Sequence, residues 1–306
     1  VAVIEEALQN DDNITIYGDY DTDGVTASSL LFEFFQLLGH EPRVYIPNRF
    51  EEGYGLNLEA IETLAAEGTR LLITVDCGIR SVREVRRAKE LGMRVIITDH
   101  HQPGSELPPA DAVINPHQPA DPYPYKELAG VGLAYKLAEA CLLSRPNPAV
   151  DLNQWLDLVA IGTVVDMAPL TGENRSLVKR GLALMRQPQR QGLFSLAQVS
   201  SINPARFNTG HLGFAIGPRL NAAGRLENAL DAFRLLTSRD VFEAGWLAQQ
   251  LDSLNSSRKE ITNQIVESAM LSIQTQDPSV PILFLTSPDY NLSLILLSEP
   301  TRLLSI

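Results

Sequence analysis

The sequence predicts an α/β fold with a mostly parallel sheet flanked by helices, followed by a helical region and a long connecting helix. From residue 1 to about residue 115, short apolar runs alternate with segments of helical character. Strands separated by helices of about ten residues are typical of βαβ units, whose strands run parallel. After Pro124 the apolar residues recur at helical spacing instead. We therefore expect the sheet in the first part of the chain and helices in the rest.

The first part contains several candidate strands, each a short apolar run. They span residues 13–17, 43–46, 71–75, 94–98 and 112–114. Helices are expected at residues 2–9, 25–38, 58–67 and 82–91. Gly39 and Gly92 follow two of these helices, where a glycine commonly ends a helix because it accepts a positive φ angle.

The second part is expected to be helical and to finish with a long helix. Shorter helices are expected at residues 127–143, 151–165, 176–185, 194–199 and 228–236, and a glycine-rich, loop-rich segment at 204–226. The long helix is expected over 241–273, where apolar residues repeat close to every 3.6 positions. About 30 helical residues extend ~45 Å, which is enough to connect to another domain. The strand-like run 280–285 would begin that domain, and we expect both ends of the chain to be cut from a longer protein.

Composition narrows the class of protein. Apolar residues make up 44% of the chain and charged residues 20%, as in ordinary globular proteins. No apolar run reaches the roughly 18 to 20 residues that span a bilayer, and no signal peptide is visible, so we expect a cytoplasmic protein without membrane contact. Cys77 and Cys141 form neither a disulfide framework nor a metal-binding spacing. The net charge of −12 argues against a protein that coats nucleic acid, but not against an enzyme whose acids bind metal ions.

Acidic residues and histidines directly follow four of the apolar runs. Asp19, Asp21 and Asp23 follow the run 14–18, Asp76 follows 71–75, and Asp99, His100 and His101 follow 95–98. These three runs are expected strands, whereas Asp166 follows a fourth apolar run, 158–165. Because the carboxyl ends of parallel strands meet at one edge of a sheet, we expect these side chains to gather there. So many carboxylates repel one another unless cations neutralise them. Carboxylate and imidazole ligands suit Mn²⁺ or Mg²⁺, and two such ions ~3.5–4 Å apart promote in-line displacement at phosphorus. The sequence therefore predicts a two-metal site for phosphate chemistry.

The spacing within these groups refines the prediction. Asp19, Asp21 and Asp23 alternate along the chain, and alternate residues of an extended chain point the same way. An EF-hand loop has the same acid spacing but requires Glu at its twelfth position, which is Leu30 here. The two adjacent histidines are expected to diverge, so that one binds metal while the other faces the substrate. For such a pair taken alone, a structural or surface role is the alternative.

Two further segments are candidates for binding phosphate or nucleotide. Residues 217–225, Gly-Pro-Arg-Leu-Asn-Ala-Ala-Gly-Arg, combine glycines that expose backbone N–H groups with Arg219, Asn221 and Arg225. Residues 48–55 place Arg49 beside aromatic residues and glycines, a combination that holds nucleotides by charge and stacking. The alternative for residues 217–225 is a plain connection, and the alternative for residues 48–55 is a solvated loop.

Taken together, these motifs resemble the DHH phosphoesterase superfamily and, within it, the RecJ-like exonucleases. The matching segments, in order, are residues 17–27, 48–56, 74–78, 98–101, 114–116, 129–132, 160–166 and 217–225. The Asp-His-His triplet marks the superfamily, whereas the Gly-Asp-Tyr-Asp-Thr-Asp-Gly sequence and the segments 48–56 and 217–225 are more specific to RecJ-like members. The resemblance covers residues 1 to about 270.

The resemblance implies roles for individual residues. The metal ligands would be Asp21, Asp23, Asp76, His100 and Asp166, with Asp19 as a further ligand or a close support. His101 would contact the scissile phosphate, so that the catalytic group would comprise His101, Asp76 and His100. The nucleic-acid backbone would be held by Arg219, Asn221 and Arg225, and the 5′ end would lie near Arg49. The implied cofactor is a pair of Mn²⁺ or Mg²⁺ ions.

The activity implied by the resemblance is a metal-dependent 5′→3′ exonuclease that hydrolyses phosphodiester bonds of single-stranded DNA in DNA repair and recombination. A helicase and a single-strand-binding protein are the expected partners. Two alternatives stay open, namely a DHH phosphodiesterase for short oligonucleotides, cyclic dinucleotides or phosphorylated nucleosides, and an inactive scaffold or fragment.

The expected domain layout follows the same resemblance. A DHH catalytic domain would span residues 1–237, with an α/β part at 1–120 and a mostly helical part at 121–237. A connecting helix would follow at 238–275, and residues 276–306 would start a truncated or divergent C-terminal domain.

Overall fold

The computed structural model describes residues 1–145 and 150–273, together with Ser287 and Tyr290. Its centre is a five-stranded sheet with the strand order β2-β1-β3-β4-β5, in which every neighbouring pair is parallel. The strands are β1 (Ile14–Gly18), β2 (Arg43–Tyr45), β3 (Leu71–Val75), β4 (Arg94–Thr98) and β5 (Ala112–Ile114). The predicted parallel α/β fold is confirmed.

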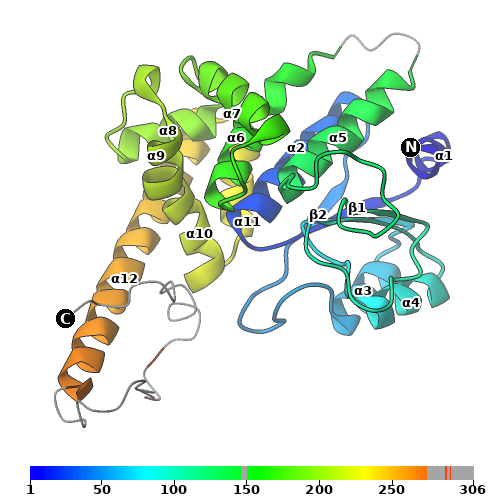
Figure 1. Ribbon diagram of the computed structural model, residues 1–306, viewed down its shortest axis with the longest axis horizontal. Helices are drawn as coiled ribbons and strands as arrows, with labels where there is room; N and C mark the ends of the chain where they lie inside the picture. The colour runs from blue at the N-terminus through cyan, green and yellow to red at the C-terminus, as the bar shows by residue number, and fades with distance from the viewer. Residues whose placement is uncertain (146–149, 274–286, 288–289, 291–306) are drawn as a thin grey trace.

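Helices cover both faces of the sheet (Figure 1). One face packs against α1 (Ala2–Gln9), α2 (Thr22–Leu37) and α5 (Gly130–Leu143), and the other against α3 (Leu58–Ala66) and α4 (Val82–Glu90). Neighbouring residues of a strand point to opposite faces, so Ile16 joins the first core and Tyr17 the second. Because both faces of β1, β3 and β4 are buried, these strands are mostly apolar rather than alternating.

The second part of the chain forms a helical layer beside α2. It comprises η1 (Leu152–Trp155), α6 (Leu156–Val165), α7 (Gly172–Met185), α8 (Gln191–Val199), η2 (Pro204–Arg206), α9 (Thr209–His211), the π-helical turn η3 (Leu212–Ile216), α10 (Gly217–Leu226), α11 (Leu230–Thr237) and α12 (Val241–Ile273). Both α6 and α11 pack against α2, so the helical layer continues the core of the first sheet face.

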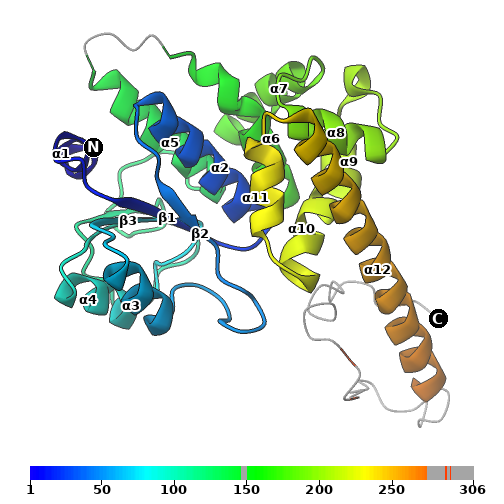
Figure 2. The same ribbon diagram turned by 180° about the vertical axis from the view of Figure 1, so that it is seen from behind.

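The long helix α12 has two unlike halves. Its buried residues lie between Ala244 and Asn255, where it packs against α8, α10 and α11. Its last turns carry exposed apolar side chains, among them Val266 and Leu271. Figures 1 and 2 show this half extending beyond the other helices.

The clearest difference from the sequence prediction lies at residues 204–226, which were expected to be rich in loops and are mostly helical. Two glycines in this segment allow neighbouring residues to pack closely against the helix instead of forming turns. A Cβ on Gly217 would lie 2.5 Å from Val165 Cγ2, and one on Gly224 would lie 2.5 Å from the Tyr20 carbonyl oxygen. Glycine therefore lets α10 approach its neighbours closely without breaking the helix.

Other predicted elements are present with shifted ends. Helix α2 begins at Thr22 rather than residue 25, and α5 begins at Gly130 rather than residue 127. Gly39 and Gly92 have φ angles of 83°, as expected for glycines that end helices. The strand expected at residues 280–285 lies outside the described residues, as does the segment 276–306 apart from Ser287 and Tyr290. Among the helices of residues 1–145 and 150–273, none is both long and apolar enough to cross a membrane.

Candidate metal centre

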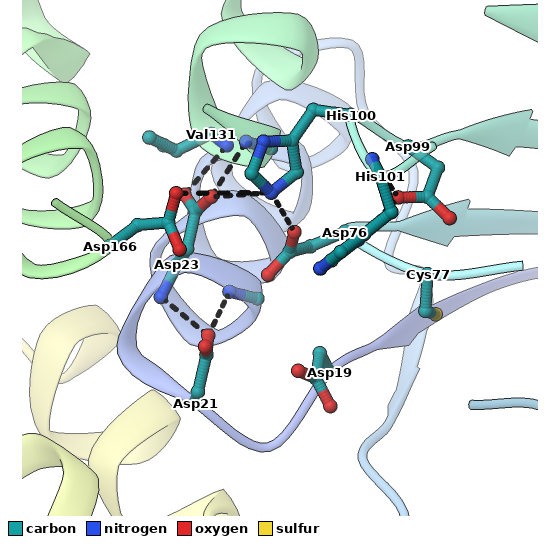
Figure 3. Close-up of polar contacts among 12 residues, drawn as sticks. Asp19, Asp21, Asp23, Asp76, Cys77, Asp99, His100, His101, Val131 and Asp166 are labelled. Carbon is teal, nitrogen blue, oxygen red and sulfur yellow. Dashed lines mark hydrogen bonds and ion pairs between the residues drawn. The ribbon is translucent and has the colours of Figure 1, made fainter. Parts of the chain in front are cut away.

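The predicted acids and histidines meet at the carboxyl-terminal edge of the sheet (Figure 3). Asp19 follows β1 and Asp76 follows β3, the adjacent strands between which the chain changes direction across the sheet. Such a switch point is where open α/β sheets bind ligands. Asp166 differs from Asp19 and Asp76 because it follows a helix, α6, and not a strand.

Three sets of ligand atoms converge in this cluster, each with its atoms within 4.8 Å of one another. The sets are Asp76, His100 and His101; Asp23, His100 and Asp166; and Asp19, Asp21 and Asp76. Because Asp76 and His100 each belong to two sets, the cluster is one continuous centre.

The start of helix α2 fixes two of the acids. Asp21 is the N-cap, and its Oδ1 accepts hydrogen bonds from the backbone N–H groups of Asp23 (2.8 Å) and Gly24 (3.1 Å). The carboxylate of Asp23 accepts backbone N–H groups of Gly130 (2.6 Å) and Val131 (2.8 Å) at the start of α5, where the helix dipole favours an anion. The expectation that these acids alternate along an extended chain is wrong for Asp23, because the helix already begins at Thr22.

Asp76 and His100 face each other in the middle of the cluster. Asp76 is 1% exposed, and its backbone has a φ of 61°, an uncommon conformation for a residue with a side chain. The Nε2 atom of His100 lies 3.0 Å from Asp76 Oδ1, 3.8 Å from Asp23 Oδ2 and 3.9 Å from Asp166 Oδ2. Neither His100 Nε2 nor Asp76 Oδ1 has a hydrogen-bond partner among the described residues. Two buried acceptor atoms therefore face a common space without a donor between them.

The charges of the cluster are only partly balanced by neighbouring side chains such as His101. Burial raises the pKa of Asp19, Asp23 and Asp76, and repulsion from a neighbouring carboxylate raises it further. The same two causes raise the pKa of Asp166 to about 7. Burial, and then the neighbouring His101, lower the pKa of His100 to about 4, so its imidazole is neutral at pH 7. Carboxylates beside a neutral imidazole are a donor set that fits Mn²⁺ or Mg²⁺, and a bound cation would reverse the shifts of the acids.

His101 has different surroundings from His100. Its Nδ1 lies 2.7 Å from Asp99 Oδ1, which also accepts the His101 backbone N–H, while Asp99 Oδ2 accepts the Ile79 N–H. Burial tends to raise the pKa of Asp99, but the hydrogen bonds from His101 outweigh burial and lower it. The hydrogen bond to Asp99 raises the pKa of His101 in turn. The His101 side chain is 44% exposed against 16% for His100, so the two rings differ in solvent access although their centroids lie only 4.6 Å apart.

The segment 48–56 borders the acid cluster. The Arg49 guanidinium lies over the ring of Tyr20, 5.1 Å from its centroid. The Tyr54 ring meets Tyr20 edge-on, and its hydroxyl lies 3.4 Å from His101 Nδ1. One cation and two aromatic rings thus line one side of the centre.

Helix α10 brings the second predicted segment to the cluster in an unexpected form. Its backbone N–H groups lie within a helix, so the prediction of a glycine-rich loop with exposed N–H groups is wrong. The Arg219 guanidinium pairs with Asp252 on α12 at 2.7 Å and donates to the Ala215 carbonyl. Asn221 Oδ1 accepts hydrogen bonds from Thr22. Burial, then Arg258 and Arg49, lower the pKa of Arg225 to about 10, so three arginines lie near one another.

Sequence reasoning missed several residues of this region. Arg258 lies in the middle of α12, and no motif marks it, because only the fold brings it near Arg225. Its Nε has no hydrogen-bond partner among the described residues. Asn115, in a segment noticed only through the resemblance, donates to the His101 carbonyl at 2.8 Å. Gly130 leaves space for Asp76, since a Cβ there would lie 2.7 Å from Asp76 Oδ1.

Fold and site together define an α/β protein with a carboxylate–histidine metal centre at the switch point of a parallel sheet. Residues 13–163 match the family described as DHH family, N-terminal domain. The chain belongs to the DHH family and, within it, to the RecJ exonuclease group, because it is similar to several RecJ proteins in sequence and in structure.

The chain is 45% identical over 273 residues to the single-stranded-DNA-specific exonuclease RecJ of Bacillus subtilis (strain 168), covering 89% of this chain and 34% of that protein. A crystal structure of exonuclease RecJ bound to manganese matches with a TM-score of 0.86 and 36% identity, covering 96% of this chain and 73% of that one. RecJ from Thermus thermophilus in complex with Mn²⁺ matches with a TM-score of 0.82 and 34% identity, covering 96% of this chain and 42% of that one. The chain spans between 34 and 49% of the length of the curated RecJ relatives.

Proposed function

We propose that this chain carries the catalytic centre of a metal-dependent exonuclease, which hydrolyses phosphodiester bonds of single-stranded DNA from the 5′ end in DNA repair and recombination. The observation that carries the proposal is the gathering of buried, uncompensated carboxylates around His100 at the sheet edge. Membership in the RecJ group supports the choice of DNA as substrate, and the 5′→3′ polarity is taken from that group.

Each residue of the cluster receives a role in this proposal. Metal would be held by Asp21, Asp23, Asp76, His100 and Asp166, with Asp19 as a further ligand or a support. A bound pair of Mn²⁺ or Mg²⁺ ions would supply Lewis-acid activation of water and stabilise the charge of the leaving oxygen. Neutral His100 keeps a lone pair at Nε2 for such an ion, and the carboxylates are fixed before binding by the starts of α2 and α5.

His101 would act on the substrate. Its Nδ1 is occupied by Asp99, which leaves Nε2 as the ring nitrogen for a substrate phosphate. The raised pKa of His101 favours the imidazolium form, which donates a hydrogen bond to a phosphate oxygen as negative charge develops there. Asp99 therefore orients the ring and stabilises its positive charge.

The arginines and aromatic rings beside the centre suit a single strand. Guanidinium groups bind phosphate oxygens, and we assign Arg49, Arg219, Arg225 and Arg258 to the nucleic-acid backbone. Tyr20 and Tyr54 offer ring faces for unstacked bases, which a single strand has and a duplex lacks. The same proposal places the protein in the cytoplasm, with a helicase and a single-strand-binding protein as partners.

We also propose the domain layout expected from the sequence, with a catalytic domain at residues 1–237 and a connecting helix at 238–275. Helix α12 spans 241–273, and its half-buried, half-exposed character supports this division. Residues 276–306 would then begin a further domain.

The proposal is tested by digesting end-labelled DNA with the metal-free chain supplied with Mn²⁺. We expect release of 5′-labelled nucleotides from single-stranded DNA, little release from duplex DNA, and none in EDTA. Release from the 3′ label first would contradict the polarity. Hydrolysis of dinucleotides but not of a long 5′-phosphorylated strand would favour the short-substrate phosphodiesterase, and no hydrolysis of any substrate would favour the inactive fragment.

A further inference from the structure

Asn221 sits at a junction between α10 and the acidic segment that starts α2. Its Oδ1 accepts two hydrogen bonds from Thr22, one from the backbone N–H and one from the hydroxyl, both at 2.8 Å. Thr22 lies between Asp21 and Asp23 in the sequence and is 1% exposed. Asn221 thus contacts the single residue that connects two of the candidate ligands.

These bonds complete the cap of helix α2. The first N–H groups of a helix have no partner within the helix. Asp21 Oδ1 accepts those of Asp23 and Gly24, while the one of Thr22 is accepted by Asn221, 199 residues later in the chain. The Asp21 carboxylate can keep its capping geometry only while the Thr22 backbone stays where Asn221 holds it.

A second contact of α10 fixes the same segment. A Cβ on Gly224 would lie 2.5 Å from the Tyr20 carbonyl oxygen, so the helix backbone packs directly against the chain between Asp19 and Asp21. The only other acceptor near the Thr22 hydroxyl among the described residues is the Gly217 carbonyl at 3.5 Å, which also belongs to α10. The acidic segment therefore contacts α10 at two residues, Tyr20 and Thr22.

We infer that Asn221 is a positioning residue of the metal centre, which holds Asp21 and Asp23 in place through Thr22, rather than a contact of the nucleic-acid backbone. The inference rests on the proposed metal-dependent function. Without the Asn221 oxygen, the buried N–H and hydroxyl of Thr22 lose their near acceptor, and the segment moves until they find another. Residues that hold metal ligands in this way typically change metal affinity about 10- to 100-fold when mutated.

The test is Mn²⁺ binding by isothermal titration calorimetry to the metal-free full chain, without DNA. Asn221→Ala is expected to bind Mn²⁺ at least about 10-fold more weakly than the wild type. Asn221→Asp keeps an oxygen acceptor for Thr22 and is expected to recover the affinity. Asn203→Ala is the matched control, since Asn203 also caps a helix with its side chain, but at η2. It is expected to leave Mn²⁺ binding unchanged.

Unchanged Mn²⁺ affinity of Asn221→Ala, within about twofold, would overturn the inference and return Asn221 to the substrate side. If Asn221→Ala shows no thermal unfolding transition and so does not fold, the Mn²⁺ affinities of Thr22→Val and Thr22→Ser test the inference instead. Thr22→Val exchanges the hydroxyl for a methyl group of similar size, whereas Thr22→Ser removes the methyl group and keeps the hydroxyl donor to Asn221. Weaker binding by Thr22→Val than by Thr22→Ser supports the inference, and equal binding overturns it. A wild-type chain that binds no Mn²⁺ contradicts the proposed function itself, which distinguishes the two failures.

Discussion

The protein contains two clusters of buried or partly buried acidic side chains, and the two clusters differ in whether a cation pairs with the acids. Between α2, α6 and α8, Glu33 and Asp157 surround Arg190, whose Nε lies 3.0 Å from Asp157 Oδ2 and whose Nη2 lies 3.1 Å from Glu33 Oε2. Trp155 Nε1 donates to Glu33, and Arg190 donates to the Leu236 carbonyl. Every charge of this ion network has a partner, and burial of the Arg190 side chain is nearly complete at 9% exposed.

The metal centre lacks any such cation at its middle. His100 is neutral there, and Asp76 Oδ1 has no donor among the described residues. A buried charge that is paired internally connects helices, whereas a buried charge left without a partner costs stability and is retained where something else binds it. The difference indicates which acids belong to the fold and which belong to the function.

The strongest way to test this contrast is to remove charge from the metal centre. Asp76→Asn keeps the shape of a side chain shared by two of the three ligand sets. We expect Mn²⁺-dependent hydrolysis to fall at least about 1,000-fold, equivalent to about 4 kcal/mol of activation free energy. His100→Ala is expected to behave in the same way. Full activity of either variant would contradict the assignment of Asp76 and His100 as metal ligands. Circular dichroism should show that both variants keep the wild-type fold.

The opposite result is expected in the ion network. Arg190→Met leaves Glu33 and Asp157 buried without their cation, and breaking a buried ion pair from one side typically costs about 3–5 kcal/mol. Urea denaturation would measure this loss in the free energy of unfolding. The contrast fails if Arg190→Met is as stable as the wild type, or if Asp76→Asn loses as much stability as Arg190→Met.

The pH dependence of stability sharpens the contrast further. The pKa of Asp166 is raised to about 7, above the value of about 4 for an unfolded aspartate. A group with a raised carboxyl pKa binds its proton more tightly in the folded chain, so its stabilising effect is present at low pH and is lost as pH rises through 7. We expect the metal-free chain to lose roughly 2–3 kcal/mol of stability between pH 5 and pH 7 from this group.

Thermal unfolding at pH 5, 6, 7 and 8 in EDTA would measure this dependence. Asp166→Asn should reduce the dependence, because Asp19, Asp23 and Asp76 with their raised pKa values still contribute to it. Saturating Mn²⁺ should reverse it, because a cation favours the ionised carboxylates. An unfolding temperature that rises with pH in EDTA for the wild type, but not for Asp166→Asn, would show that the sign is wrong.

The smallest expected effect concerns the arginines beside the centre. Arg258 approaches Arg225 rather than the acids, so we expect it to serve the substrate. Arg258→Met should weaken single-stranded DNA binding by about 1 kcal/mol and reduce the dependence of affinity on salt by about one phosphate contact. Fluorescence anisotropy at several salt concentrations measures both. Arg86→Met, on α4 and paired with Glu106, is the control and should change neither.

Much of this architecture could be predicted because parallel sheets place their sites at one edge. The strands before Asp19, Asp76 and Asp99 are short and mostly apolar, and their ends had to converge once the strands ran parallel. The position of the centre therefore follows from the parallel direction of the strands and from residue type, without knowledge of side-chain geometry.

Other features depend on tertiary contacts that no local pattern reveals. The glycines of α10 resemble a loop in the sequence, yet they are needed because Tyr20 and Val165 approach the helix. The interaction of Asp23 with the start of α5 required knowing where two distant helices meet. Arg258 carries no sequence signal, because its neighbours come from other parts of the chain.

The long separation between Asn221 and Thr22 also has a consequence for the newly made chain. A ribosome adds roughly 5–20 residues per second, so the 199 residues between the two take roughly 10 to 40 s to make. During that interval the acids of the α2 segment exist without the helix that supports them, and α5 and α6 are added in turn. The centre is therefore complete only after α10 has left the ribosome, because Thr22 has no contact with Asn221 before then.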